Sequence, residues 1–115
     1  MADRTFPVHR DDRGELLVVE GDELDFPVRR VFTVVGRAGG GPRGGHRATC
    51  TELLVLVSGA ATVTLERSGP AAEVHVLEKP GDSVTIARGD HVDYQLDGPH
   101  SVVVVLCDEP YRSPA

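Results

Sequence analysis

The apolar residues of this chain occur in short runs that Gly, Pro, Asp and Ser interrupt at nearly regular intervals, and no run keeps a helical period. Such runs are typical of β-strands, which need only about four to eight residues, whereas helices need about ten or more. The pattern predicts strands at 15–20, 28–35, 51–57, 61–66, 73–78, 83–87, 91–96 and 101–107. Because no interval between them has room for a crossover helix, we expect an all-β sandwich or barrel.

Two segments depart from this even pattern. Residues 102–106 form an unbroken apolar run, which indicates a strand that is buried on both faces. The segment 36–45 is rich in glycine, which suits either a flexible connection between strands or a backbone that lies close to a bound ligand. The residues that follow this segment favour the second interpretation.

Composition limits the classes of partner. With 115 residues the chain has room for one domain, 1–115, and one core. Its net charge of −6, its lack of Trp and its aromatic content of 4% disfavour a nucleic-acid partner, which needs surplus Lys and Arg and aromatic stacking surfaces. No apolar leader opens the sequence and no run approaches a membrane span, so we expect a cytoplasmic protein without a membrane partner. Cys50 and Cys107 lie in or beside apolar runs and are expected to be buried free thiols.

A spaced motif starts at Gly40, where the chain reads G-x5-H-x-A-x3-E-x6-G as far as Gly59. Residues two apart on a strand face the same side, so His46, Ala48 and Glu52 are expected to face the interior. The pattern resembles the first signature motif of the cupin superfamily, in which a second His stands in the place of Ala48. The resemblance implies a cupin-type double-stranded β-helix, a jelly-roll barrel with its working pocket inside.

Other segments extend the resemblance. Between Gly81 and His91 the chain is similar to the second cupin motif, with Ala87 in place of Pro and with the His one residue early. A closer resemblance, to the dTDP-sugar 3,4-ketoisomerases of the WxcM-like and FdtA-like kind, covers most of the chain. The segments that carry it, in the family's order, are 12–16, 19–20, 26–27, 30–32, 42–46 and 102–111.

This resemblance implies an enzyme of deoxysugar or secondary-metabolite biosynthesis that moves a keto group between C4 and C3 of a nucleotide-linked 6-deoxyhexose. Enzymes of the family work without a metal or other cofactor and usually form dimers by exchanging an N-terminal strand. For this chain we expect a homodimer in which the segment 17–19 pairs with the partner's sheet. The chain departs from the family where Ala48 replaces the second His of the RGxHAH motif, where Glu52 replaces a Gln, and where no Trp lies near His91.

An isomerase of this kind needs groups that accept and return a proton and donors near the forming oxyanion. His46 is the candidate general base or acid, because an imidazole titrates near neutral pH. His91 and Tyr94 are its candidate catalytic partners. Arg30 and Arg43 are candidate substrate-binding residues, because a guanidinium offers paired donors to a pyrophosphate.

Glu52 completes the predicted substrate-binding set, and a buried carboxylate needs a partner such as Arg43, His46 or a metal. A metal-dependent cupin with His46, Glu52 and His91 as ligands is therefore a second interpretation, since two imidazoles and a carboxylate form known non-haem iron sites. A third interpretation is a repurposed cupin that binds or cyclises a small biosynthetic intermediate. Loss of the second His at position 48 would accompany that change of use.

Overall fold

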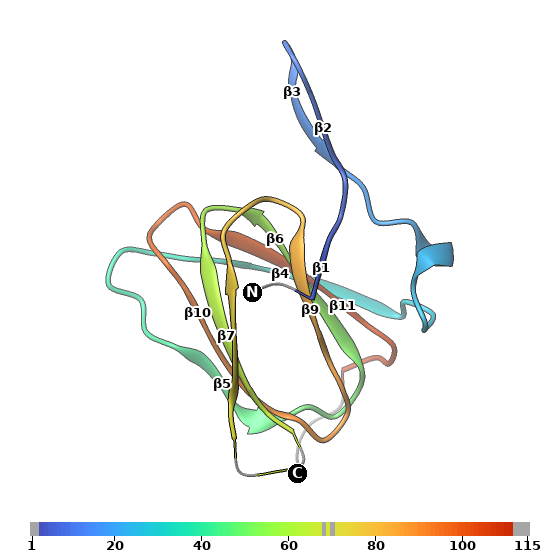
Figure 1. Ribbon diagram of the computed structural model, residues 1–115, viewed down its shortest axis with the longest axis vertical. Helices are drawn as coiled ribbons and strands as arrows, with labels where there is room; N and C mark the ends of the chain where they lie inside the picture. The colour runs from blue at the N-terminus through green and yellow to red at the C-terminus, as the bar shows by residue number, and fades with distance from the viewer. Residues whose placement is uncertain (1–2, 68, 70, 112–115) are drawn as a thin grey trace.

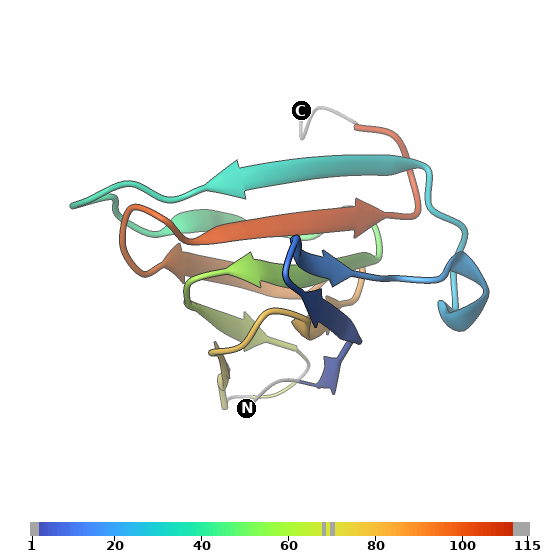
Figure 2. The ribbon, with the colours of Figure 1, turned by 90° about the horizontal axis from the view of Figure 1, so that it is seen from above.

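The computed structural model describes residues 3–67, 69 and 71–111, and these residues form two facing antiparallel sheets and one projecting hairpin (Figures 1 and 2). The five-stranded sheet has the order β1 (Arg4–Thr5), β9 (Asp82–Ile86), β6 (Glu52–Ser58), β11 (Val102–Cys107) and β4 (Arg30–Val35). The four-stranded sheet has the order β5 (Arg43–Arg47), β10 (His91–Leu96), β7 (Ala61–Glu66) and β8 (Glu73–Leu77). The all-β prediction is confirmed, and every predicted strand is present at or near its expected place.

Three strands were not predicted from the sequence. The strand β1 has two residues, and β2 (Val8–Asp11) is mostly exposed and polar, so neither carries an apolar pattern. The strand β5 lies inside the glycine-rich segment, whose composition argued for a loop. The predicted strand 15–20 is shorter in the structure, where β3 covers Gly14–Leu17 and a short 3₁₀ helix, η1, covers Gly21–Glu23.

The main core lies between the two sheets, and a second apolar cluster covers the outer face of the five-stranded sheet. Alternate residues of β11 serve the two clusters: Val103, Val105 and Cys107 are fully buried between the sheets, whereas Val104 and Leu106 pack outward. The outward residues are only half-buried. The prediction that residues 102–106 are buried on both faces is therefore wrong for the outer face.

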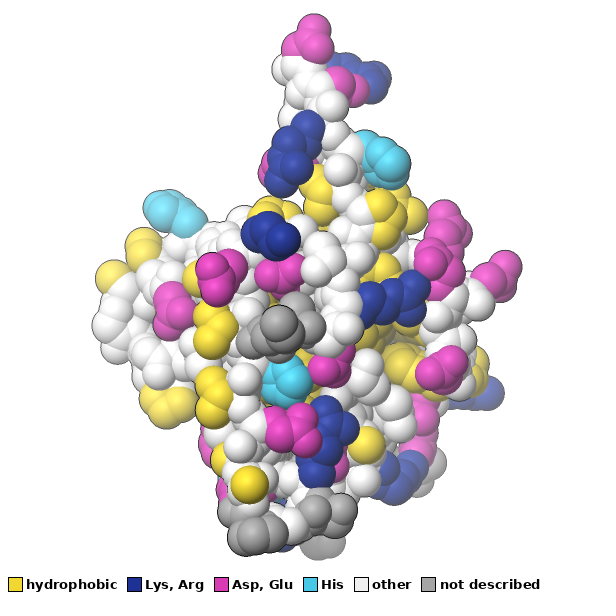
Figure 3. Space-filling view, viewed as in Figure 1, with side chains coloured by type: hydrophobic (Ala, Val, Ile, Leu, Met, Phe, Trp, Pro, Cys, Tyr) yellow, Lys and Arg dark blue, Asp and Glu magenta, His cyan; other side chains and the backbone are white. Residues whose placement is uncertain are grey.

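The β2–β3 hairpin projects from the sandwich (Figure 1), and among the described residues its strands pair only with each other. Charged side chains gather at its tip and hydrophobic side chains at its base (Figure 3). A groove of about 580 Å³ lies between the hairpin and the outer sheet face, and Leu17, Val19, Val104 and Leu106 contribute to its wall. No helix among the described residues is long and apolar enough to cross a membrane.

Candidate active site

A cavity of about 430 Å³ opens between the two sheets. The inner faces of both sheets contribute polar side chains to it, and apolar core residues form the rest of its wall. Of the residues predicted to form a site, five line this cavity: Arg30, Arg43, His46, Glu52 and Tyr94.

A β-bulge gives Arg43 and His46 a common face. Residues three apart on a regular strand point to opposite faces, yet here His46 pairs with the buried Val92 and Arg43 pairs with Tyr94, so both side chains face the cavity. The register shifts between these pairs because Gly45 is left without an opposing residue on β10. Gly44 and Gly45 adopt φ angles of +92° and +74°, which glycine adopts without strain.

Gly44 is also required by a close approach between backbones. A Cβ atom at this position would lie 2.5 Å from the carbonyl oxygen of Val92. The glycine-rich segment thus fixes the strand that presents His46, which is a structural reason for its composition.

Ala48 occupies the place of the expected second imidazole and is buried in the main core. Its N–H donates to the Asp90 carbonyl at 2.8 Å, and its carbonyl accepts from the Gly89 N–H at 2.8 Å. Ala48 thus packs in the main core, whereas His46, an exposed residue of β5, lines the cavity. The methyl side chain of Ala48 takes the place of the second imidazole ring in the family motif.

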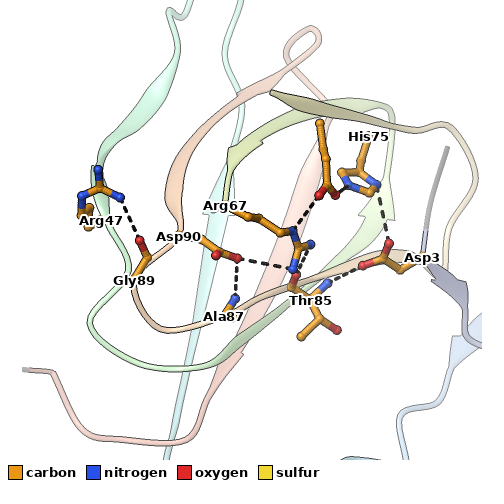
Figure 4. Close-up of polar contacts among 9 residues, drawn as sticks. Asp3, Arg47, Arg67, His75, Thr85, Ala87, Gly89 and Asp90 are labelled. Carbon is orange, nitrogen blue, oxygen red and sulfur yellow. Dashed lines mark hydrogen bonds and ion pairs between the residues drawn. The ribbon is translucent and has the colours of Figure 1, made fainter. Parts of the chain in front are cut away.

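The turn that holds Ala48 is supported by a polar network (Figure 4). The carboxylate of the buried Asp90 accepts from the Ala87 N–H at 2.9 Å and lies 3.5 Å from the Arg67 guanidinium, which also donates to the Thr85 carbonyl. Arg47 at the end of β5 donates to the Gly89 carbonyl at 3.0 Å. These contacts hold the end of the strand that presents His46.

Glu52, at the start of β6, is a partly buried carboxyl group whose surroundings disfavour its ionisation. Burial raises its pKa above the ordinary carboxyl value, whereas the charges of His46 and Arg30 lower it and Asp108 adds to the rise. The net shift is upward, so the carboxyl group retains its proton to higher pH than an exposed glutamate does. A protonated Glu52 can donate a hydrogen bond into the cavity.

Tyr94 and the two arginines give the cavity its remaining polar groups. Burial raises the pKa of Tyr94, the charge of Arg43 opposes this rise and Glu52 adds to it, so the phenol is a neutral donor at physiological pH. The Arg30 guanidinium lies 4.7 Å from the ring centre of Phe32 and 4.9 Å from that of Tyr111. These stacking contacts restrain a cation at the cavity wall.

Tyr111 and Cys50 are among the cavity residues that were not predicted as site residues. Tyr111 was part of the family resemblance but was given no role, and it lines the cavity beside Arg30. Cys50 also lines it, and its thiol lies 4.0 Å from the Glu52 carboxylate. The prediction that Cys50 and Cys107 are buried free thiols is confirmed.

His91 is not among the residues of the cavity wall. Because side chains alternate along β10, the inward positions belong to Val92 and Tyr94, and His91 lies on the opposite face. Its Nδ1 atom is 3.6 Å from carboxylate oxygens of Glu66 and Asp93. The expectation that His46, Glu52 and His91 surround one cavity is therefore wrong. These three residues are not placed to bind one metal ion together. The imperfect motif match explains this, since a His one residue early falls on the other face.

Comparison with known proteins agrees with this architecture. The model of the FdtA family, described as WxcM-like, C-terminal, matches residues 3–114. The chain belongs to this family. Among curated proteins, none matches the FdtA-family chain closely enough to count as a relative.

Solved structures similar to this FdtA-family chain confirm the cupin jelly roll. QdtA, a sugar 3,4-ketoisomerase from Thermoanaerobacterium thermosaccharolyticum in complex with TDP, has a TM-score of 0.82 at 21% identity over 95% of this chain and 80% of its own. The WlaRB TDP-quinovose 3,4-ketoisomerase from Campylobacter jejuni has a TM-score of 0.81 at 24% identity, covering 96% and 86%. ChmJ, a 3′-monoepimerase from Streptomyces bikiniensis in complex with dTDP-quinovose, has a TM-score of 0.80 at 21% identity, covering 96% and 64%.

Proposed function

We propose that this FdtA-family cupin is a keto-isomerase of sugar nucleotides that acts on a nucleotide-linked 4-keto-6-deoxyhexose by proton transfer through His46. The observation that carries the proposal is the bulge at Gly45, which turns His46 and Arg43 into one cavity with Tyr94 and Glu52. Membership of the FdtA family and the ketoisomerase neighbours support the choice of substrate class. A cytoplasmic location remains a prediction from the sequence.

The reaction requires a proton to leave C3 and another to reach C4. His46 accepts the C3 proton, and the bonding electrons form a C3=C4 enediol while O4 takes a proton from Tyr94. The imidazolium then returns its proton to C4, while the C3 hydroxyl gives its proton to the Tyr94 phenolate and becomes the ketone, which restores both side chains. His91 has no part in this scheme, because it lies on the outer face of its strand.

Arg30 and Arg43 are assigned to the pyrophosphate of the substrate. They approach the cavity from different sheets, and a pyrophosphate between them would accept hydrogen bonds from both guanidinium groups. QdtA has been crystallised with TDP. We therefore expect TDP alone to bind the present protein and to compete with the sugar nucleotide.

The decisive experiment is incubation with TDP-4-keto-6-deoxyglucose in D₂O, followed by proton NMR. We expect a 3-keto product, with deuterium at C4 or at C3 of returned substrate where the proton on His46 exchanges with solvent. His46→Asn should lower the rate by roughly 10²–10⁴-fold, the usual contribution of a general acid–base group, and His91→Asn is the matched control that should leave it unchanged. Full activity of His46→Asn would contradict the assignment of the proton carrier.

The core position of Ala48 supports a second candidate, a repurposed cupin that binds or cyclises a small intermediate. Ala48→His separates the two uses, with TDP affinity as its control. Gain of keto-sugar isomerisation in this variant, with none in the natural chain, would indicate a ketoisomerase that has lost its second imidazole. TDP binding without isomerisation in either protein would favour the repurposed cavity.

We also propose that the protein is a homodimer in which the segment 17–19 pairs with the partner's sheet. The support lies in the projecting β2–β3 hairpin and in the apolar groove at its base. Exchange of a strand would cover both the groove and an open sheet edge. Light scattering at micromolar concentration should give twice the chain mass of 12.3 kDa, and a monomer would contradict the proposal.

A further inference from the structure

Two thiols and a carboxylate meet at the inner wall of the barrel. Cys107, the last residue of β11, pairs directly with Glu52, the first residue of β6, and Cys50 lies two residues before Glu52. Paired residues of neighbouring strands share a face, which brings the three side chains together. One ligand atom from each lies within 4.8 Å of the other two.

The two thiols of this cluster lie beside a carboxyl group, unlike an ordinary buried cysteine, which has only apolar neighbours. Burial raises the pKa of the Cys107 thiol to about 12, and the neighbouring Glu52 and Cys50 add to the rise. Burial likewise raises the pKa of Cys50, with Glu52 and Asp108 adding to it. The Glu52 charge therefore opposes ionisation of both thiols, an unfavourable interaction that a bound dication would relieve.

The distances also suit a metal. A tetrahedral zinc ion with Zn–S bonds of about 2.3 Å holds its thiolates about 3.8 Å apart, so ligand atoms within 4.8 Å need only small side-chain adjustments. Cys50 and Glu52 both line the cavity, which leaves the fourth coordination position facing its interior. Three protein ligands with one open position is the arrangement of zinc sites that accept a water or another small ligand.

We propose that Cys50, Cys107 and Glu52 form a binding site for a thiophilic divalent cation, Zn²⁺, with its fourth position open to the cavity. This set shares only Glu52 with the ligands His46, Glu52 and His91 considered from the sequence. The proposal goes beyond the proposed isomerase and does not depend on it. Because Glu52 belongs to both sites, zinc and the sugar nucleotide are expected to compete.

The test is metal titration of the full chain after reduction of its thiols. Equilibrium dialysis with Zn²⁺ should give one equivalent per chain, and Co²⁺ in its place should show the intense near-ultraviolet absorption of thiolate-to-cobalt charge transfer. Cys50→Ser and Cys107→Ser should each weaken zinc binding by more than the roughly 10–100-fold that loss of an outer-shell partner costs. His91→Asn, which removes an imidazole outside the cavity, is the matched control and should bind as the natural chain does.

X-ray absorption of the zinc-loaded natural chain keeps the test independent of variants that fail to fold. We expect two sulfur atoms at about 2.3 Å and lighter atoms at about 2.0–2.2 Å. Absence of binding by the reduced protein, a shell of nitrogen and oxygen alone, or unchanged affinity in both serine variants would each overturn the proposal.

Discussion

The bulge that presents His46 can be tested by adding a single methyl group at Gly44. A residue with a Cβ in the left-handed region costs about 1–2 kcal/mol, and overpacking adds about 1–3 kcal/mol, because the new atom would lie 2.5 Å from the Val92 carbonyl oxygen. We therefore expect Gly44→Ala to lower the free energy of unfolding by about 2–5 kcal/mol. Urea denaturation with linear extrapolation measures this difference.

Two neighbouring glycines separate the contributions. Gly45 has a φ of +74° but only an ordinary contact at 3.5 Å, so Gly45→Ala should show the conformational cost alone, about 1–2 kcal/mol. Gly41 has open space around its Cβ position, and Gly41→Ala should change stability by less than about 1 kcal/mol. If Gly44→Ala is no less stable than Gly45→Ala, the close approach of β5 to β10 is wrong. A shifted β5 should also weaken TDP binding, because Arg43 and His46 would no longer share a face.

Three further variants follow from the charges and donors of the structure. The folded state raises the pKa of Glu52 above 4.5, so ionisation of this carboxyl group lowers the free energy of unfolding as pH rises through the folded pKa. Glu52→Gln should therefore be more stable than the natural chain near pH 7. Thermal unfolding across pH should show that this difference vanishes on acidification. Burial opposes ionisation of Asp82, but hydrogen bonds donated by Glu78, Thr5 and Lys79 outweigh this effect and hold the pKa of Asp82 below 3.8. The ionised Asp82 therefore stabilises the folded protein above that pH, and this stabilisation is lost as pH falls through the folded pKa. Asp82→Asn should thus cost about 1–3 kcal/mol at neutral pH in urea denaturation and less in acid, and a constant cost would contradict the charge argument. Tyr94→Phe should lower kcat by up to roughly 10²-fold with an unchanged urea midpoint, and an unchanged kcat would remove Tyr94 from the mechanism.

The apolar strands could be predicted well because their runs of apolar residues directly reflect which side chains are buried. It did not predict β5, since the glycines that permit the bulge are the same residues that argue for a loop. The motif spacing placed His46 and Glu52 correctly, because each is counted from nearby residues of one segment. It misplaced His91, since one residue of offset reverses the face of a strand.

The thiol cluster shows a different limit of sequence reasoning. Cys50 and Cys107 could be predicted to be buried, but their meeting with Glu52 depends on the register between β6 and β11. That register joins segments about fifty positions apart, and no local pattern specifies it. The contact of Arg30 with Tyr111 depends on tertiary structure in the same way, whereas its contact with Phe32 joins residues two apart on one strand.

The place of β11 in the five-stranded sheet has a consequence for biosynthesis. This strand comes last of the described strands in the chain, yet it lies between β4 and β6 and pairs with both. A nascent polypeptide that has not yet emerged as far as Val102 therefore exposes two open strand edges, which are templates for association with other chains. Cooperative folding must wait until translation has delivered β11, and a ribosome that stops before this strand should yield insoluble product rather than a smaller working domain.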